Sequence, residues 1–246
     1  SMPPPIPAPQ DIPYPGGTIQ LSVDASQPVQ GIMRVHEVIP VAKSGPLTLL
    51  YPRWLPGNHS PSGPISKLAG LIVHAGGQVL PWQRDPIDVY AFHVDVPNGA
   101  REVTADFQYL SPVEDREGRV VSTDVIVNLE WNAVLLYPAG YFSRRIPVQA
   151  DVKLPPGWGI GTALEGSGGH FKTTTLNTLV DSPILAGKYF SRVDIDPGAK
   201  VPVHLDIAAD RPGQLKITPA ELAAHKALVQ QAYKLYGSHH YDHYDF

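Results

Sequence analysis

The last ten residues, GSHHYDHYDF at 237–246, gather side chains that could bind a metal. Imidazole nitrogens and carboxylates are common zinc ligands, and this stretch offers them from His239, His240, His243, Asp242 and Asp245. A true site also needs a defined geometry and hydrogen-bonded support around its ligands. The cluster is therefore interpreted as a strand or loop that binds metal adventitiously at most, or as the beginning of something larger.

The stretch HEVIP at 36–40 begins like the H-E-x-x-H motif of zinc peptidases. In that motif the histidines lie four residues apart on one helical face, and the glutamate acts on the metal-bound water. Here Pro40 occupies the second histidine position, and the neighbouring residues read as a strand. We therefore predict a surface pair of His36 and Glu37 on a strand.

Motifs of other reaction classes are missing as well. The chain has no G-x-S-x-G elbow, which rules out that form of serine nucleophile. The glycines of GSGG at 166–169 stand between two strand-like segments and are not followed by a helix. They therefore predict a turn and not a phosphate-binding loop.

The segment VNLEWNAVLLYPAGY at 127–141 is the most informative one. Asn128, Glu130 and Asn132 recur at every second position of an otherwise apolar stretch, so they are expected on one face of a strand. That face is either the solvent side of an edge strand or the lining of a polar cleft. The long loop YPRWLPGNHSPSGPI at 51–65 is likewise either functional or simply packed.

The elements that must position these residues are mostly strands. Ile19, Leu21 and Val23 alternate with polar residues, and similar segments recur about every 10–20 residues. Gly76-Gly77 lies between two apolar runs and predicts a hairpin. With 27 prolines, 22 glycines and no repeat, the chain favours an antiparallel β-rich fold over a βαβ fold.

One helix is predicted near the C-terminus. Thr218, Pro219 and Glu221 form a capping box, apolar residues follow at three- and four-residue steps, and Gly237 ends the helix, which should span about 219–236. The change of pattern predicts three parts: a proline-rich arm at 1–17, a β-rich domain at 18–213, and the start of another domain at 214–246.

The composition excludes several classes of function. Apolar residues make up 43% and charged residues 17% of the chain, and the net charge is −4 without a basic stripe. A nucleic-acid partner is therefore not expected, nor is a membrane partner, since no apolar run approaches the length of a spanning helix. The absence of cysteine excludes disulfides and thiolate metal sites.

Three motifs together resemble the N-terminal part of the glycyl aminopeptidase family of gluzincin zinc metallopeptidases, which often carry a PDZ domain. The first is Trp54-x-Pro56-Gly57 followed by KLAGLIVHAGGQVLPW, the second is LVDSPILAG at 179–187, and the third is HYDHYDF at 240–246. The likeness spans essentially the whole chain. At Asn58-His59, however, the family has a small residue and a tyrosine, so no role of that tyrosine carries over.

The resemblance implies a saddle- or sandwich-like, mainly β, antiparallel aminopeptidase domain with one C-terminal α-helix. In the family, H-E-x-x-H and the third zinc ligand lie downstream of the HYDF position, so we expect a fragment without its catalytic motif and inactive alone. Its partners would be its own catalytic domain, which holds Zn in the full-length enzyme, and the peptide substrate's N-terminus. The family also implies a periplasmic or secreted location after removal of a signal peptide, and removal of Gly- or Ala-type N-terminal residues.

The resemblance also implies the substrate-binding residues. Related gluzincin aminopeptidases have a Gln-x-Glu pair before a hydrophobic strand, and its glutamate binds the α-amine of the substrate. Asn128 and Glu130 occupy these positions, and Trp131 follows them. The alternative is a stand-alone β-sandwich that binds sugars or peptides on an aromatic platform of Trp54, Trp82, Trp131 and Tyr137.

Overall fold

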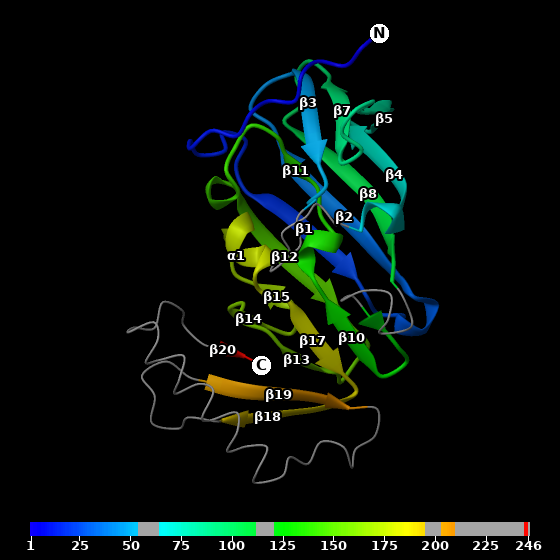
Figure 1. The fold of residues 1–246 in the computed structure, drawn as a ribbon, viewed down its shortest axis with the longest axis vertical. Coiled ribbons are helices and arrows are strands. Elements are labelled where there is room, and N and C mark those ends of the chain that lie inside the picture. Colours follow the sequence, from blue (N-terminus) through cyan, green and yellow to red (C-terminus); the bar gives the residue numbers. More distant parts are fainter. Residues whose placement is uncertain (54–63, 112–120, 195–202, 210–243, 246) are drawn as a thin grey trace.

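The computed structural model describes residues 1–53, 64–111, 121–194, 203–209 and 244–245. Strands dominate this part of the chain and form four sheets (Figure 1). The prediction of a mainly β fold is confirmed.

The largest sheet has nine strands. Eight run in the order β14-β15-β12-β1-β2-β8-β4-β5, and the ninth, β16, pairs with β12. Their bounds are Gly166–Ser167 (β14), His170–Phe171 (β15), Pro147–Lys153 (β12), Ile19–Asp24 (β1), Ile32–Pro40 (β2), Glu102–Leu110 (β8), Leu68–Ala75 (β4), Gln78–Leu80 (β5) and Thr174–Thr175 (β16).

Three smaller sheets complete the fold, in the orders β13-β17-β10-β9, β11-β3-β7-β6 and β18-β19-β20. Their strands are Gly159–Gly161 (β13), Ile184–Gly187 (β17), Ile126–Leu129 (β10), Val121–Ser122 (β9), Tyr137–Pro138 (β11), Gly45–Leu50 (β3), Ala91–Val96 (β7), Trp82–Arg84 (β6), Tyr189–Asp194 (β18), Val203–Ala209 (β19) and Tyr244–Asp245 (β20).

Most strand pairs are antiparallel, as predicted, and two described pairs are parallel: β1 with β12 and β19 with β20. The predicted hairpin is the turn between β4 and β5. Gly76 and Gly77 there have φ of 57° and 79°, the left-handed values that a two-residue hairpin turn of this kind requires. Of the predicted turn at 166–169, Gly168 and Gly169 join β14 to β15, whereas Gly166 and Ser167 form β14 itself.

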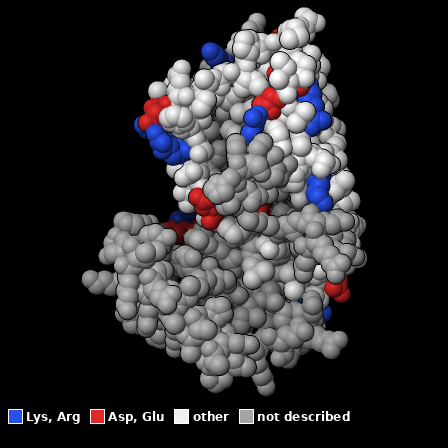
Figure 2. All heavy atoms as spheres, viewed as in Figure 1, with Lys and Arg blue, Asp and Glu red and all other residues white. Residues whose placement is uncertain are grey.

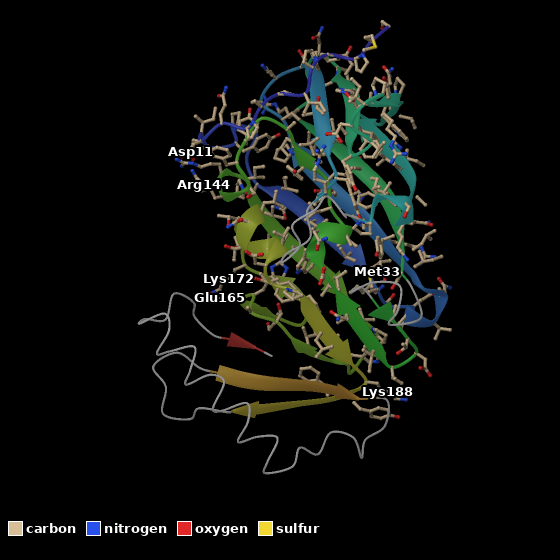
Figure 3. All side chains as sticks on the ribbon, in the orientation of Figure 1. Asp11, Met33, Arg144, Glu165, Lys172 and Lys188 are labelled. Atoms are coloured by element: carbon tan, nitrogen blue, oxygen red, sulfur yellow. The ribbon has the colours of Figure 1, made fainter. Side chains whose placement is uncertain are left out.

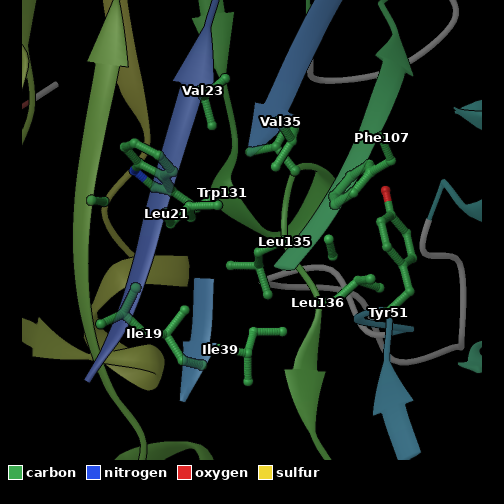
Figure 4. Close-up of a cluster of buried hydrophobic side chains, with 14 of the residues drawn as sticks. Ile19, Leu21, Val23, Val35, Ile39, Tyr51, Phe107, Trp131, Leu135 and Leu136 are labelled. Atoms are coloured by element: carbon green, nitrogen blue, oxygen red, sulfur yellow. The ribbon is translucent and has the colours of Figure 1, made fainter. Parts of the chain in front are cut away.

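The core lies on one face of the nine-stranded sheet, because alternate residues of its central strands point inward. The side chains of Ile19, Leu21 and Val23 on β1 are buried, while Gln20 and Ser22 between them are exposed. The segment 131–136 is buried along its whole length and packs into the same core (Figure 4).

The described part of the chain contains one α-helix, α1 (Leu176–Val180), and short 3-10 turns. These turns are η1 (Pro28–Gln30), η2 (Ile65–Lys67), η4 (Trp131–Ala133) and η5 (Ser143–Arg145). The predicted helix at 219–236, the domain boundary near 213 and the histidines at 239, 240 and 243 all lie outside the described residues.

The proline-rich arm at 1–17 packs along the domain. Gln10 pairs with the segment beside it through its N–H to the Gly140 oxygen, at 3.1 Å, and its oxygen to the Phe142 N–H, at 3.0 Å. Asp11 and Arg144 point toward each other (Figure 3) and form an ion pair of 2.7 Å, while Arg145 binds the second Asp11 oxygen at the same distance. The arm is thus held by backbone and charge together.

Charged side chains are dispersed over the described part of the face in Figure 2, where several Lys or Arg residues lie beside Asp or Glu. Among the described helices, none has the length and apolar character that crossing a membrane would require.

Candidate functional site

Glu130 stands at the point where strand β10 ends. Val127 and Leu129 are fully buried, while Asn128 and Glu130 on the opposite face are half-buried. Glu130 keeps an extended backbone, with φ of −102° and ψ of 124°. The predicted two-residue alternation therefore holds as far as Glu130, and Asn128 lies on the same side.

The alternation stops at the next residue because the chain enters the 3-10 turn η4. The Ala133 N–H donates to the Glu130 oxygen at 3.1 Å, and the Val134 N–H donates to the Trp131 oxygen at 3.1 Å. The spacing predicts that Asn132 shares a strand face with Glu130, and this prediction is wrong. The side chain of Asn132 is instead buried in the turn.

Three hydrogen bonds from distant parts of the chain hold this turn. The Tyr51 hydroxyl donates to the Ala133 oxygen at 2.7 Å, and the Trp131 indole N–H donates to the Ser182 oxygen at 3.0 Å. The Leu136 N–H donates to a Glu37 carboxyl oxygen at 2.8 Å. The backbone that follows Glu130 is thus fixed in place, which is what a binding group needs to keep its geometry.

Trp131 lies in the core, not at the surface. Its side chain is 0% exposed, and its ring meets the ring of Phe171 edge to face at 6.2 Å between centroids. The Trp131 side chain is therefore inaccessible in this structure, and its part in substrate binding stays a prediction. Trp131 likewise cannot belong to an exposed aromatic platform, whereas Trp82 on β6 is 37% exposed, and nothing supports the sugar- or peptide-binding alternative. Trp54 lies outside the described residues.

Glu37 also differs from its prediction. His36 is exposed and pairs with Asp106 at 2.6 Å, but Glu37 points to the core and is 1% exposed. Burial, opposed in part by the hydrogen bond from the Leu136 N–H, raises the pKa of Glu37 to about 8. The predicted surface pair is therefore half correct, and Glu37 is a neutral group at pH 7 that holds the backbone of the turn.

Two buried tyrosines surround the same turn. Burial, and secondarily the negative charge of Glu130, raises the pKa of Tyr109 to about 12. Burial raises the pKa of Tyr51 well above its usual range, with a further contribution from Tyr109. Because such an electrostatic effect requires proximity, the Glu130 carboxylate lies near the phenol of Tyr109.

The long loop that carries the Trp-x-Pro-Gly motif starts beside this turn. Tyr51, which binds the turn, is followed two residues later by Arg53, which forms an ion pair with Asp88. The Arg53 guanidinium also lies 5.3 Å from the centre of the Tyr90 ring. Residues 54–63 lie outside the described residues, so Asn58 and His59 are not placed.

Sequence reasoning missed Glu37, Tyr51 and Tyr109 as members of this site. One signal was present, because Glu37 interrupts an apolar alternation of Met33, Val35 and Ile39 on β2. A carboxyl on the inner face of a strand requires a hydrogen-bonding partner. The tyrosines gave no comparable signal, since buried tyrosine is common in cores.

The described residues include no group of three His, Cys, Asp or Glu side chains placed to hold a metal ion. This part of the chain therefore offers no ligand set for zinc, and no chemical step is assigned to a metal here. What the arrangement offers is a rigidly placed carboxylate on a half-buried surface.

Several solved structures have a fold similar to that of this chain. An aminopeptidase N family protein from Idiomarina loihiensis superposes with a TM-score of 0.75 at 14% identity, over 93% of this chain and 38% of that one. An M1 zinc metallopeptidase from Deinococcus radiodurans, bound to a Tyr-Ser-Ala substrate, gives 0.51 at 11% identity, over 96% and 55%. Yeast LTA4 hydrolase in complex with bestatin gives 0.52 at 14%, over 93% and 36%.

At these identities the likeness concerns the fold, and the chain spans only about a third to a little over half of each neighbour's length. The family follows from the sequence itself, because residues 20–188 match the model of the Peptidase M61 N-terminal domain. This match covers more than half of the chain, which therefore belongs to the Peptidase M61 N-terminal domain family. No curated protein matches the sequence.

Proposed function

We propose that this chain is the N-terminal part of a zinc-dependent aminopeptidase of the glycyl aminopeptidase type, and that it lines the active-site cleft. Its own catalytic domain supplies the zinc and the H-E-x-x-H motif, and the chain alone is inactive. The parent enzyme removes Gly- or Ala-type N-terminal residues. The family match and the fold support this proposal.

Within this proposal, Glu130 binds the free α-amine of the peptide substrate. The observation that carries the assignment is the fixed turn behind it, in which the Tyr51, Trp131 and Glu37 contacts immobilise the residues directly after Glu130. A half-buried carboxylate makes a strong, charge-assisted hydrogen bond to an ammonium group. Fixing the amine decides which peptide bond reaches the metal, which restricts cleavage to the N-terminal residue.

Asn128 has a supporting role in the same proposal. It lies on the face of β10 that Glu130 shares and is half-buried like it. Its side-chain amide can accept a hydrogen bond from the substrate amine or donate one to a peptide oxygen. Trp131 contributes indirectly, because its indole N–H ties the turn to Ser182.

The test is the kinetics of Glu130→Ala in the parent enzyme, with substrates whose amine is free or acetylated. Loss of an ionic partner from a half-buried site costs roughly 2–4 kcal/mol, or about 30- to 1,000-fold in kcat/KM for the free amine. Acetylated substrates, which carry no ammonium group, should change little.

Asp124→Asn is the matched control, since Asp124 is an exposed acidic residue in the turn before β10. Its replacement should leave kcat/KM unchanged for both substrates. If Glu130→Ala lowers kcat/KM equally for both substrates, or changes it for neither, the amine-binding role is rejected. The periplasmic or secreted location belongs to the same proposal, and fractionation of the native cells tests it.

A further inference from the structure

Asn132 is an exception in an otherwise well-paired turn. Its side chain is 1% exposed, and neither its Oδ1 nor its Nδ2 atom has a hydrogen-bond partner among the described residues. An amide offers two donors and an oxygen acceptor, and leaving a buried polar group unpaired is destabilising. An apolar side chain of the same size would avoid this cost.

The neighbouring polar groups show that the turn is not loosely packed. The Ala133 oxygen accepts a hydrogen bond from the Tyr51 hydroxyl at 2.7 Å, and the Ala133 N–H donates to the Glu130 oxygen at 3.1 Å. The Leu136 N–H donates to the Glu37 carboxyl at 2.8 Å. Each of these backbone groups is paired with good geometry. Among the described side chains, the buried atoms without a partner are confined to Asn132, which lies between two residues that are held in place.

Two polar side chains from distant strands reach the backbone of the segment that carries Asn132. The phenol of Tyr51 binds the next residue, and the carboxyl of Glu37 binds the backbone four residues further on. Internal waters occupy such places, where they make about three hydrogen bonds to groups that would otherwise be unpaired. The two N–H donors and the oxygen acceptor of the Asn132 amide, all buried and unpaired among the described residues, are the kind of partners that one water molecule requires.

We propose that Asn132 binds an internal water molecule behind the Glu130 turn and that, through it, Asn132 is a positioning residue for Glu130. The link is short, because the Ala133 N–H next to Asn132 donates to the Glu130 oxygen. A shift of residue 132 therefore moves the backbone of Glu130. The water site stands on its own, whereas its effect on catalysis rests on the proposed function of Glu130.

The water site is tested by a crystal structure of the unaltered protein that shows ordered solvent. The expected result is a solvent peak about 2.7–3.2 Å from Oδ1 or Nδ2 of Asn132, with a second protein partner at a similar distance. An amide without solvent, or one paired with a protein atom, overturns the proposal. This readout is independent of activity, so it holds whether or not Glu130 binds the amine.

The positioning role is tested with Asn132→Leu in the parent enzyme, which keeps the side-chain size but removes every polar atom. We expect kcat/KM for free-amine substrates to fall about tenfold, with little change for acetylated ones, because a displaced binding group loses its alignment. If kcat/KM falls equally for both substrates, or for neither, the positioning role of Asn132 is overturned. Asn177→Leu, at an exposed asparagine of α1, is the control and should change kcat/KM for neither substrate.

Discussion

Burial of Glu37 should make the stability of this protein depend on pH in an unusual direction. The carboxyl is 1% exposed and accepts a hydrogen bond from the Leu136 N–H. Its pKa is about 8 in the folded chain, against an ordinary value of 4.5. Between these two values the folded state holds a proton that the unfolded state has released, so the free energy of unfolding decreases as the pH rises.

The magnitude follows from the linkage relation. Each pH unit within the window costs about 1.4 kcal/mol for one proton. From pH 5.5 to 7.5 the Glu37 carboxyl should therefore remove about 2–3 kcal/mol of stability. The loss ends above about pH 8, where the folded state is ionised as well.

The perturbation is Glu37→Gln, which keeps an oxygen acceptor for the Leu136 N–H but cannot ionise. Urea unfolding of both proteins at pH 5.5 and 7.5 gives the difference directly, because the other titrating groups, including the histidines, are common to both. We expect the variant to lack this loss of stability. The free energy of unfolding of Glu37→Gln, relative to that of the original protein, should therefore be about 2–3 kcal/mol higher at pH 7.5 than at pH 5.5.

Glu102→Gln serves as the control, since Glu102 is exposed on β8, opposite Pro40 of the strand that carries Glu37. It should leave the pH slope unchanged. Equal slopes for the original protein and Glu37→Gln would show that the Glu37 carboxyl is already ionised or hydrated in the folded state. The reasoning from burial would then be refuted.

Two pairs of substitutions test the packing of the core and of two turns. Trp131→Phe should cost about 2–4 kcal/mol of unfolding free energy, because it leaves the buried Ser182 oxygen unpaired and creates a cavity, whereas Trp82→Phe at a partly exposed site should cost about 1 kcal/mol. Urea unfolding measures both, and similar losses would contradict the core role of Trp131. Gly169→Ala should destabilise strongly, since its φ is +82° and a Cβ would lie 2.1 Å from a carbonyl oxygen of β12, whereas Gly76→Ala, with open space around it, should cost only about 1 kcal/mol. Equal melting temperatures for the two glycine variants would contradict the steric explanation.

Local chemistry in the sequence was sufficient for many of the elements. The alternation of Ile19, Leu21 and Val23 defines a half-buried strand, because successive side chains of a strand point to opposite faces. Gly76-Gly77 defines a hairpin because both residues adopt positive φ without a Cβ penalty. The side of the sheet on which Asn128 and Glu130 lie follows from the same periodicity.

Pairing between distant segments was beyond such reasoning. The parallel pairing of β1 with β12 joins residues that lie more than a hundred positions apart, and no local signal distinguishes it from an antiparallel pair. The same holds for the buried phenols of Tyr51 and Tyr109. The contact of Tyr51 with Ala133 and the proximity of Tyr109 to Glu130 depend on how the sheets pack and not on any motif.

By itself, the sequence determined a mainly β chain and a carboxylate at the end of a strand, because both depend on neighbours along the chain. Only the tertiary structure decided what happens immediately after Glu130. There the partners of the turn come from positions 51, 82 and 99 residues away, for Trp131, Ala133 and Leu136 respectively. These contacts end the strand, bury Trp131 and Asn132, and so leave Glu130 as the last polar group of its face.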